Sequence, residues 1–541
     1  MAMETDLTLK EPAVTGRGDK RGLWGIINKK IFVPPALLLV VAVLFGLLNP
    51  ESFGKGASEA LSFTLKYFGW FYTIGSTFLL GFCLWAGFSK YGDIKLGGPD
   101  AEPELSLFNW WAIAICAGIA IGIVFFGVSE PMSHYTTPAP FLGYEPKSLA
   151  AGEHAMRYAF FHWTFHTYGI YVSSAICIAF AFYNTRKPFK VSSSLYPLIG
   201  DRIKGNWGYF VDGLAIFAIV GGVGTSLGFG TMQIGGGMKF LWGIEPNNIV
   251  WLLIIGVLTL CYTISSYTGL QKGIRLLSEN NIRLYFLLMA FVLFFGPTIH
   301  VLESTVTAVG DYLSNLVPMS FYLDPMGKSG WPGSWSNFYW AWWLAFAPIV
   351  GLFLVRLGYG RTIRQFVTVN LIGPAIFGMV WFGIFGSTSI YMEHFKNAGI
   401  AKVIAEHGNE VSLFALFQHF PMPSLTMILG MLAVAVSFIT LADSMTSTIA
   451  SMTTKGFGES REDKEPPAVM KIFWGIVMGL FSWVLLISGG ASALQTSVIV
   501  CGLPILVLQI FMVAGYIRAM GNLKEYDKVN PPIRKSSLYE E

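Results

Sequence analysis

The chain has 541 residues, of which 53% are hydrophobic, 15% aromatic and only 13% charged, and its formal net charge is +4. Soluble globular proteins carry about twice that charged fraction, so the composition excludes a soluble protein, and we expect no nucleic-acid partner. The mean hydropathy of +0.56 instead indicates an all-α integral membrane protein in contact with lipid.

The apolar segments of the chain predict about twelve membrane-spanning helices. These lie near residues 32–50, 66–88, 107–128, 154–184, 208–238, 247–267, 282–304, 335–357, 367–393, 424–452, 469–489 and 493–519. A polar leader, residues 1–31, precedes them without a cleavage signal, and a short tail of mixed charge, residues 521–541, follows them. Two amphipathic segments, near residues 306–316 and 402–417, are expected to lie on the outer surface or to cap the outer vestibule.

Basic residues test the orientation of these spans. They gather at residues 17–30, 186–204, 272–283 and 356–364, segments that all fall on one side of the membrane if the helix count is right. The positive-inside rule makes that side the cytoplasm, and both termini then lie there. The cysteines all lie in apolar segments without paired spacing, so we expect neither a disulfide framework nor a metal site.

The most unusual stretch is residues 338–346, FYWAWWLAF, which crowds six aromatic rings into nine positions. Tryptophan usually stands at the water interface of a membrane helix rather than along its length. The run therefore suggests the wall of a cavity that favours π-faces. A methylated ammonium ion is attracted to such rings by roughly 0.5–2 kcal/mol per ring. An interfacial aromatic belt or plain helix packing is the alternative.

Small residues mark the third predicted span. Gly118, Ala120 and Gly122 alternate with isoleucines. Glycine at this depth lets the backbone unwind or approach a ligand closely, and irregular backbone persists there only where it lines a cavity. We therefore expect a broken helix, with a small-residue packing seam between Gly118 and Gly122 as the alternative.

The fourth predicted span adds further aromatic residues. At about 100° per residue, Trp163, Tyr168 and Tyr171 fall within an arc of roughly 140°, so one helix face can present all three to a cavity. His162 and His166 lie one turn apart, but no carboxylate stands between them and no third ligand is evident. We interpret them as buried, hydrogen-bonded histidines, with proton relay as the remaining option.

Oxygen-bearing side chains occupy the fifth and tenth predicted spans. The fifth holds Thr225 within a glycine-rich segment, and the tenth holds Ser437, Thr440 and Asp443. An acid inside the membrane costs about 2.5–3.5 kcal/mol on insertion scales, so Asp443 is a functional candidate. A carboxylate hydrogen-bonded to the backbone of a bent helix is the alternative.

The order of these features suggests an internal repeat. The glycine-rich third span and the oxygen-rich fifth span are matched, five spans later, by the aromatic eighth and the oxygen-rich tenth. Two five-helix units of opposite topology fit the inverted-repeat design of secondary transporters, with the substrate held between them. The predicted divisions are two extra helices with a linker (32–106), a first repeat (107–304), an outer amphipathic connector (305–334) and a second repeat (335–520).

In these residues, the chain resembles the betaine/choline/carnitine transporter family along nearly its whole length after the leader. The most specific matches are residues 117–131, FHWTFH at 161–166, FYWAWW at 338–343 and GRTIR at 360–364, and ADS at 442–444 agrees. The resemblance implies a LeuT-like core of two inverted repeats preceded by two extra helices, often in a homotrimer, in a bacterial-type cytoplasmic (inner) membrane. It implies transport by alternating access rather than catalysis.

The resemblance also implies an aromatic box for the ammonium group of the substrate. The box maps onto Trp163, Tyr168, Tyr171 and Trp343, with Trp340 and Trp342 as neighbours along the path. Tyr168 stands where the sodium-coupled betaine symporters of the family look to have Trp, so the box is modified but still aromatic.

Two departures leave the substrate open among glycine betaine, choline, carnitine and trimethylamine. Phe346 stands where those symporters resemble one another in having Trp. Phenylalanine has no donor, so a betaine carboxylate needs another partner. Ala120 replaces the middle glycine of the family's third-span motif, and its methyl group narrows the space beside the ligand.

The ion to which substrate transport is coupled is the second open question. In sodium-coupled relatives, third-span carbonyls and consecutive Thr and Ser hydroxyls of the tenth span form one cation site. The candidate positions here are Cys116, Ile119, Ser437, Thr440 and Thr225, but Leu441 replaces the second of the consecutive hydroxyls. A hard cation binds less well with one oxygen ligand fewer. We therefore leave open sodium, a proton, or sodium-independent exchange of substrate for product, and we expect no cofactor.

Two other classes of membrane protein, an enzyme and a channel, fit the sequence less well. A membrane-embedded enzyme would use His162, His166 and Glu130 or Asp443, but none of these has the spacing of a metal or nucleophile site. A channel is disfavoured because broken helices at mid-membrane and a ligand-sized aromatic cage favour saturable binding.

Overall fold

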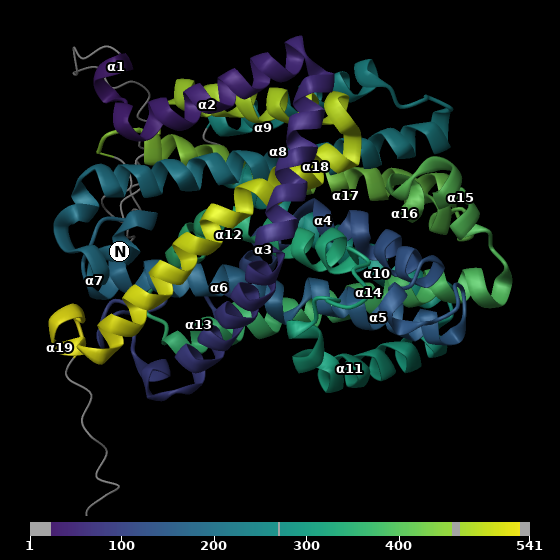
Figure 1. The fold of residues 1–541 in the computed structure, drawn as a ribbon, viewed down its shortest axis with the longest axis horizontal. Coiled ribbons are helices and arrows are strands. Elements are labelled where there is room, and N and C mark those ends of the chain that lie inside the picture. The colour runs from purple at the N-terminus through teal and green to yellow at the C-terminus, as the bar shows by residue number, and fades with distance from the viewer. Residues whose placement is uncertain (1–22, 269–270, 457–465, 531–541) are drawn as a thin grey trace, which may run out of the picture.

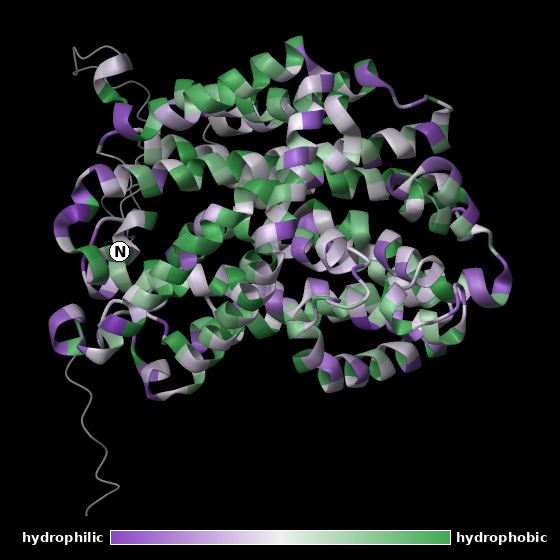
Figure 2. Cartoon of the chain, in the orientation of Figure 1, coloured by the Kyte–Doolittle hydropathy of each residue, from purple (hydrophilic) through white to green (hydrophobic). Residues whose placement is uncertain are grey.

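The computed structural model describes residues 23–268, 271–456 and 466–530, and this part of the chain is almost entirely helical (Figure 1). Among the described residues, 9 helices are long and apolar enough to cross a membrane, or up to 10 if a bent helix pair counts as one span. Hydrophobic residues run along the helices, and hydrophilic residues collect at their ends and in the connections (Figure 2). The all-α membrane class is confirmed, whereas the total of about twelve crossings stays a prediction.

The first half of the chain forms the following elements. They are α1 (Leu23–Ile26), α2 (Lys29–Leu48), α3 (Pro50–Phe88), η1 (Lys90–Asp93), α4 (Leu107–Thr136), η2 (Pro140–Leu142), α5 (Leu149–Trp163), α6 (Phe165–Ala179), η3 (Phe180–Asn184), η4 (Val191–Leu195), α7 (Tyr196–Ile199), η5 (Gly200–Lys204), α8 (Asn206–Trp242) and α9 (Asn248–Thr268). Here η marks a short 3-10 or π turn.

The second half continues in the same manner. It contains α10 (Gln271–Phe295), α11 (Thr298–Phe321), η6 (Gly333–Asn337), α12 (Phe338–Leu357), α13 (Ile363–Val367), η7 (Thr368–Ile372), α14 (Gly373–Lys396), α15 (Ile400–His407), η8 (Asn409–Val411), α16 (Ser412–Phe417), α17 (Pro423–Thr453), α18 (Ala468–Gly521) and α19 (Leu523–Tyr526). Ordered backbone pairing between extended segments is limited, among the described residues, to two isolated bridges, Ile27 with Thr454 and Lys95 with Thr362.

The longest element, α18, is two helices joined at a kink. Gly489 and Gly490 lie outside helical geometry, and Gly490 has a φ of 56°, a conformation that glycine adopts without a Cβ clash. The kink separates the two last predicted spans at the position that the hydropathy pattern indicates.

Two predicted boundaries are wrong. The predicted span 282–304 ends early, because α10 stops at Phe295 and a bend of 112° leads into α11. Proline lacks the backbone N–H that would continue the helix and disfavours helical geometry in the residue before it, so Gly296-Pro297 causes the break. The predicted amphipathic segment 306–316 is part of α11, and the division of the chain into repeats stays a prediction. In addition, residues 50–65 are helical, as the polar first part of α3.

The second predicted outer segment, 402–417, forms α15 and α16. The residues of α16 are all buried, whereas most of α15 is partly or fully exposed. Gly430 of α17 and Gly237 of α8 lie against Phe414 of α16. The segment therefore caps the ends of α8 and α17 rather than lying flat on the surface.

The helix with the aromatic run lies in the core of the bundle. In the most apolar window of Gly333–Leu357, 94% of the residues are buried, against 22% in the window of Asn248–Ser265, which belongs to the peripheral α9. All residues from 338 to 350 are buried. Rings so placed meet neither lipid nor the membrane surface, so the interfacial-belt interpretation is wrong.

The segments predicted to be cytoplasmic meet at one end of the bundle. The backbone N–H of Leu96 donates to the carbonyl of Arg361 at 2.9 Å, and the side-chain amide of Asn530 donates to the carbonyl of Lys95 at 2.9 Å. The amide of Asn184 reaches Asp527 at 3.3 Å. Figure 1 shows α7 and α19 at this end and α15 and α16 at the other. The segments after α3, α6, α12 and α18 thus share one side, as the predicted topology requires.

Candidate functional site

Three of the predicted box residues are in ring contact where α5, α6 and α12 meet. The rings of Trp163 and Trp343 lie edge to face with centroids 5.2 Å apart, and the ring of Tyr171 lies edge to face with that of Trp343 at 5.5 Å. All three side chains are buried. Aromatic side chains from the fourth and eighth predicted spans are therefore in one cluster.

A break in the helix positions Trp163. It is the last residue of α5, because Thr164 has φ −127° and ψ −115°, and α6 begins at Phe165. The hydroxyl of Thr167 donates to the carbonyl of His162 at 2.6 Å, which satisfies one of the acceptors that the break leaves. Interrupted helices at membrane depth are tolerated where the backbone is buried in protein or lines a cavity, and this break lies in the buried core of the bundle.

The expected break in the third span is wrong, because α4 is continuous from Leu107 to Thr136. Its small residues serve close packing instead. A Cβ on Gly122 would lie 2.7 Å from the ring of Trp163 and 3.4 Å from that of Trp342. Glycine at this position lets the box rings approach the α4 backbone. The side chains of Cys116, Gly118, Ile119 and Ala120 lie outside the described residues.

Trp342 and Phe346 adjoin the box. The ring of Trp342 stacks on that of Trp343 with centroids 6.1 Å apart, and it meets Phe229 of α8 at 5.4 Å. Phe346 packs against α8, because a Cβ on Gly222 would lie 2.8 Å from its ring. Both side chains are buried.

Trp340 and Tyr168 are placed differently. Trp340 stacks on His166 with centroids 5.0 Å apart and meets Phe161 edge to face at 5.2 Å, so its ring contacts lie on the α5–α6 side. Tyr168 is buried in α6, one turn before Tyr171. Their part in substrate binding stays a prediction.

A buried carboxylate on α4 anchors one residue of the box by a hydrogen bond. Glu130 of α4 has no exposed surface, and its Oε2 accepts hydrogen bonds from the indole N–H of Trp163 at 2.6 Å and the hydroxyl of Tyr339 at 2.5 Å. Its Oε1 lies 2.6 Å from Nδ1 of His162 and 3.3 Å from Nε2 of His134. We call Glu130, His134 and His162 the Glu130 cluster. It fixes the indole of Trp163 in the plane that faces Trp343.

The contacts within the Glu130 cluster are hydrogen bonds. Its ligand-type atoms lie within 4.8 Å of one another, which is the proximity that a metal site needs. However, two ligands of one zinc ion each stand about 2.0–2.2 Å from the metal and therefore about 3.3 Å apart. The 2.6 Å between Glu130 and His162 is too short for that, and it is the length of a charge-assisted hydrogen bond.

The candidate cation ligands are divided between two interfaces. Ser437 of α17 accepts from the amide of Asn281 at 2.8 Å and lies 2.5 Å from the hydroxyl of Tyr285, both on α10. Thr225 of α8 donates to the carbonyl of Leu494 in α18 at 2.9 Å.

The remaining polar residues of α17 lie along the same helix. Thr440 donates to the carbonyl of Val436 at 2.9 Å and is partly exposed. Asp443, the membrane acid, is buried.

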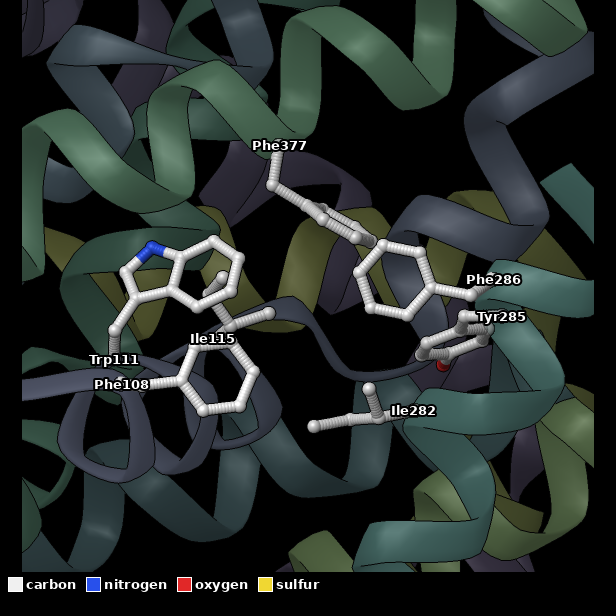
Figure 3. Close-up of a pocket in the computed structure, with 7 residues that line it drawn as sticks. All are labelled: Phe108, Trp111, Ile115, Ile282, Tyr285, Phe286 and Phe377. Carbon is white, nitrogen blue, oxygen red and sulfur yellow. The ribbon is translucent and has the colours of Figure 1, made fainter. Parts of the chain in front are cut away.

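A small apolar pocket lies apart from the box (Figure 3). Phe108, Trp111 and Ile115 of α4 line one side of it, and Ile282, Tyr285 and Phe286 of α10 with Phe377 of α14 line the other. Its walls are apolar and hold no box residue. A charged substrate finds neither a counter-charge nor the paired indoles there, so the box remains the candidate site.

Sequence reasoning missed part of the site. On sequence alone, Glu130 has a role only in the enzyme alternative, and His134 and Tyr339 have none. A signal was present, because Glu130 is an acid in an apolar segment, the same feature that singled out Asp443, and His134 lies four residues later on the same helix face. The contact with Tyr339 joins residues 209 positions apart and had no local signal.

A bundle with a lipid-facing shell, a buried cage of aromatic rings and an interrupted helix beside it defines a multi-pass membrane transporter. Comparison with known proteins identifies the transporter family. The family model described as BCCT, betaine/carnitine/choline family transporter, matches residues 30–525. The chain belongs to this family.

Individual relatives agree. The chain is 38% identical to the glycine betaine transporter OpuD of Bacillus subtilis (strain 168), over 92% of this chain and 96% of that protein. It is 36% identical to an ectoine/hydroxyectoine transporter of Virgibacillus pantothenticus, over 91% of this chain and 97% of that protein. A solved sodium-coupled sialic acid symporter superposes with a TM-score of 0.45 at 15% identity, covering 84% of this chain and 86% of that one.

Proposed function

We propose that this protein is a secondary transporter that carries glycine betaine, or a close methylated ammonium zwitterion, across the membrane by alternating access. The observation that carries the proposal is the contact of Trp163, Trp343 and Tyr171 in the core of a chain of this family. A quaternary ammonium has no N–H to donate, so ring faces are the groups that attract it. The rings come from helices on both sides of the predicted repeat boundary, so both predicted repeats contribute to the site.

Two buried donors support a substrate that also carries a carboxylate. The indole N–H groups of Trp342 and Trp343 are buried and have no hydrogen-bond partner among the described residues. Such a donor gains most from an anionic acceptor, at about 1.5–3 kcal/mol per hydrogen bond. We propose that these indoles bind the substrate carboxylate, for which Phe346 offers no donor. Glycine betaine and carnitine carry such an acceptor, and choline does not.

A binding panel tests the proposal. The purified protein is titrated with glycine betaine, choline, carnitine, trimethylamine and ectoine, each with and without sodium. We expect saturable binding of glycine betaine, tighter than that of choline by about tenfold to hundredfold, the worth of one charge-assisted hydrogen bond. Absence of saturable binding for every compound would reject the proposal. Binding of choline as tight as that of betaine would reject the role of the indole donors and leave the box intact.

The coupling ion is a narrower proposal. We propose a sodium site of low affinity that uses Thr440, because Leu441 supplies no hydroxyl beside it. In proteoliposomes with an imposed sodium gradient, uptake of glycine betaine is expected to fall at least several-fold when potassium replaces sodium, and Thr440→Ala is expected to raise the sodium concentration needed for half-maximal uptake. Equal uptake in both salts would instead support sodium-independent exchange, which preloading the vesicles with substrate then tests.

We further propose that the protein lies in a bacterial cytoplasmic membrane as a homotrimer with both termini inside. The basic segments near residues 186–204 and 356–364 support this orientation. Cross-linking in native membranes tests the trimer, and a monomeric mass in mild detergent together with no cross-linked species would contradict it.

A further inference from the structure

The Glu130 cluster carries one negative charge in its simplest protonation state. An ionised carboxylate has about four lone-pair positions, and Glu130 meets four donors: the indole of Trp163, the hydroxyl of Tyr339, and ring nitrogens of His162 and His134. With both imidazoles neutral, every position is used and the cluster is a buried anion. A buried charge is tolerated only with such full hydrogen bonding.

The Glu130 cluster can bind one additional proton without losing a hydrogen bond. His162 uses Nδ1 for Glu130, and its Nε2 lies 2.9 Å from the hydroxyl of Ser336. A serine hydroxyl both donates and accepts, so it donates to a neutral imidazole and accepts from a protonated one. Protonation of His162 at Nε2 therefore needs only rotation of the Ser336 hydroxyl. The Nδ1 atom of His134 has no acceptor among the described residues, which makes His162 the better proton site.

One side chain, Trp163, separates the charged cluster from the rest of the box. Trp163 donates to Glu130 at one edge of its indole and faces Trp343 with its ring. An ammonium ion in the box would thus lie about one indole width from the cluster. At that distance, roughly 8–10 Å, and an effective dielectric of about 20, one unit charge changes the affinity for a cation by roughly tenfold to thirtyfold.

We propose that the Glu130 cluster is a proton-binding site that opposes binding of the substrate ammonium. The anionic cluster attracts the ammonium, and a proton on the cluster cancels this attraction. Coupling between two binding events is reciprocal, so the ammonium must also expel the proton. This inference rests on the proposed function, because it requires an ammonium in the box.

Other titratable groups surround the cluster and are part of the account. They are His154, Arg157 and Tyr158 on α5, Tyr339 on α12 and Asp311 on α11. Arg157 pairs with Asp311 at 3.2 Å, so this pair adds little net charge. Glu393, with Lys147, forms a separate group beside Tyr135 and His394. His166 bonds Ser320 at 3.0 Å rather than Glu130.

The test uses the full chain at fixed, saturating sodium and glycine betaine as the probe, whose quaternary ammonium carries no dissociable proton. Calorimetric titrations between pH 5 and pH 9, in two buffers that differ in ionisation enthalpy, give the dissociation constant and the number of protons released. We expect the affinity to fall roughly tenfold or more from the alkaline to the acid end. We also expect release of up to one proton per betaine bound. A constant affinity with no proton release across this range overturns the inference.

Variants assign the effect to the cluster. Glu130→Gln keeps the size of the side chain but removes its charge, so betaine is expected to bind weakly and equally at all pH values. Ser336→Ala removes the hydroxyl that donates to neutral His162 and accepts from protonated His162. Because the hydrogen bond to the charged imidazole is the stronger of the two, the pH dependence should shift to lower pH. The matched control, Glu393→Gln, removes a buried acid outside the cluster and should keep the wild-type profile. Wild-type pH dependence that persists in Glu130→Gln overturns the assignment.

The two levels of failure are separable. If the wild-type chain binds no compound of the panel at any pH, the proposed function fails. If it binds glycine betaine independently of pH, the function stands and the proton site fails.

Discussion

At the scale of single residues, the cage is held by polar contacts that its own rings do not reveal. Trp163 and Tyr339 both donate to Glu130, so a carboxylate fixes the ring planes. Trp343 has no such anchor and is positioned by ring contacts with Trp163, Tyr171 and Trp342. Substitution of Trp163 therefore removes a hydrogen bond to Glu130 as well as a ring, whereas substitution of Trp343 removes ring contacts.

We expect Trp343→Ala to weaken betaine binding by between about twofold and about thirtyfold, the worth of one ring face. Trp163→Ala should cost more, because it also leaves Glu130 without one donor. Trp343→Leu should fail like Ala, since leucine restores hydrophobicity without a quadrupole. Titration calorimetry measures these constants, and the exposed Trp242 provides the matched control Trp242→Ala. Normal affinity in Trp343→Leu would contradict the box.

The sequence predicted the composition of the cage but not its support. The prediction that Trp163, Tyr168 and Tyr171 share one face of a continuous helix is wrong, because the break at Thr164 places Trp163 on α5 and the two tyrosines on α6. Trp163 and Tyr171 meet through their common contact with Trp343 instead. The hydrogen bond from Tyr339 to Glu130 connects residues in different helices, and no local pattern encodes it. For the same reason, the sequence did not predict that the ring of Trp340 contacts His166. Trp340 belongs to the same aromatic run as Trp343, but the contact joins two different helices.

At the scale of helices, the interruption lies one span later than the glycines suggested. Glycine permits irregular backbone but does not require it, and in α4 it permits close packing instead. The break occurs at Thr164, in a sequence without glycine or proline at the break itself. By contrast, the breaks at Gly296-Pro297 and Gly489-Gly490 follow directly from residue type. Breaks caused by local chemistry can be predicted from sequence, and those caused by tertiary contacts cannot.

Gly122→Ala tests the packing role of α4. Its Cβ would stand 2.7 Å from the ring of Trp163, so the ring must move away from the place where it bonds Glu130. We expect betaine affinity to fall about tenfold or more and thermal stability to fall, since overpacking costs about 1–3 kcal/mol. Gly256→Ala in α9, where the added methyl meets nothing within 4 Å, is the control and should preserve both. Unchanged affinity in Gly122→Ala would show that Trp163 does not need its observed position.

At the scale of the whole molecule, contacts between distant segments fix the two ends of the bundle. The segment around Lys95 pairs with Thr362 and accepts from Asn530, which joins the connections after α3, α12 and α18. At the opposite end, Lys147 pairs with Glu393 at 3.3 Å. The helix count and the charge pattern predicted this division of the connections, because each crossing reverses the direction of the chain.

Cysteine labelling tests the orientation. In a background without the native cysteines, Met326→Cys lies in a connection at the predicted outer end, and Lys204→Cys lies at the predicted cytoplasmic end. Both native side chains are well exposed, at 92% and 67%. A membrane-impermeant maleimide applied to intact cells should label the first position, and the second only after permeabilisation. The reverse pattern would invert the topology and place the termini outside.

The contacts of Glu130 constrain how the protein can change shape. One carboxylate bonds side chains of α5 and α12 and belongs to α4, so these three helices cannot slide past one another without breaking buried, charge-assisted hydrogen bonds. If they travel together, the rings that hold the cargo keep their spacing whether the cavity opens toward one compartment or the other. The cargo would then be held equally well from either face, and the concentrations that half-saturate inward and outward transport would be similar.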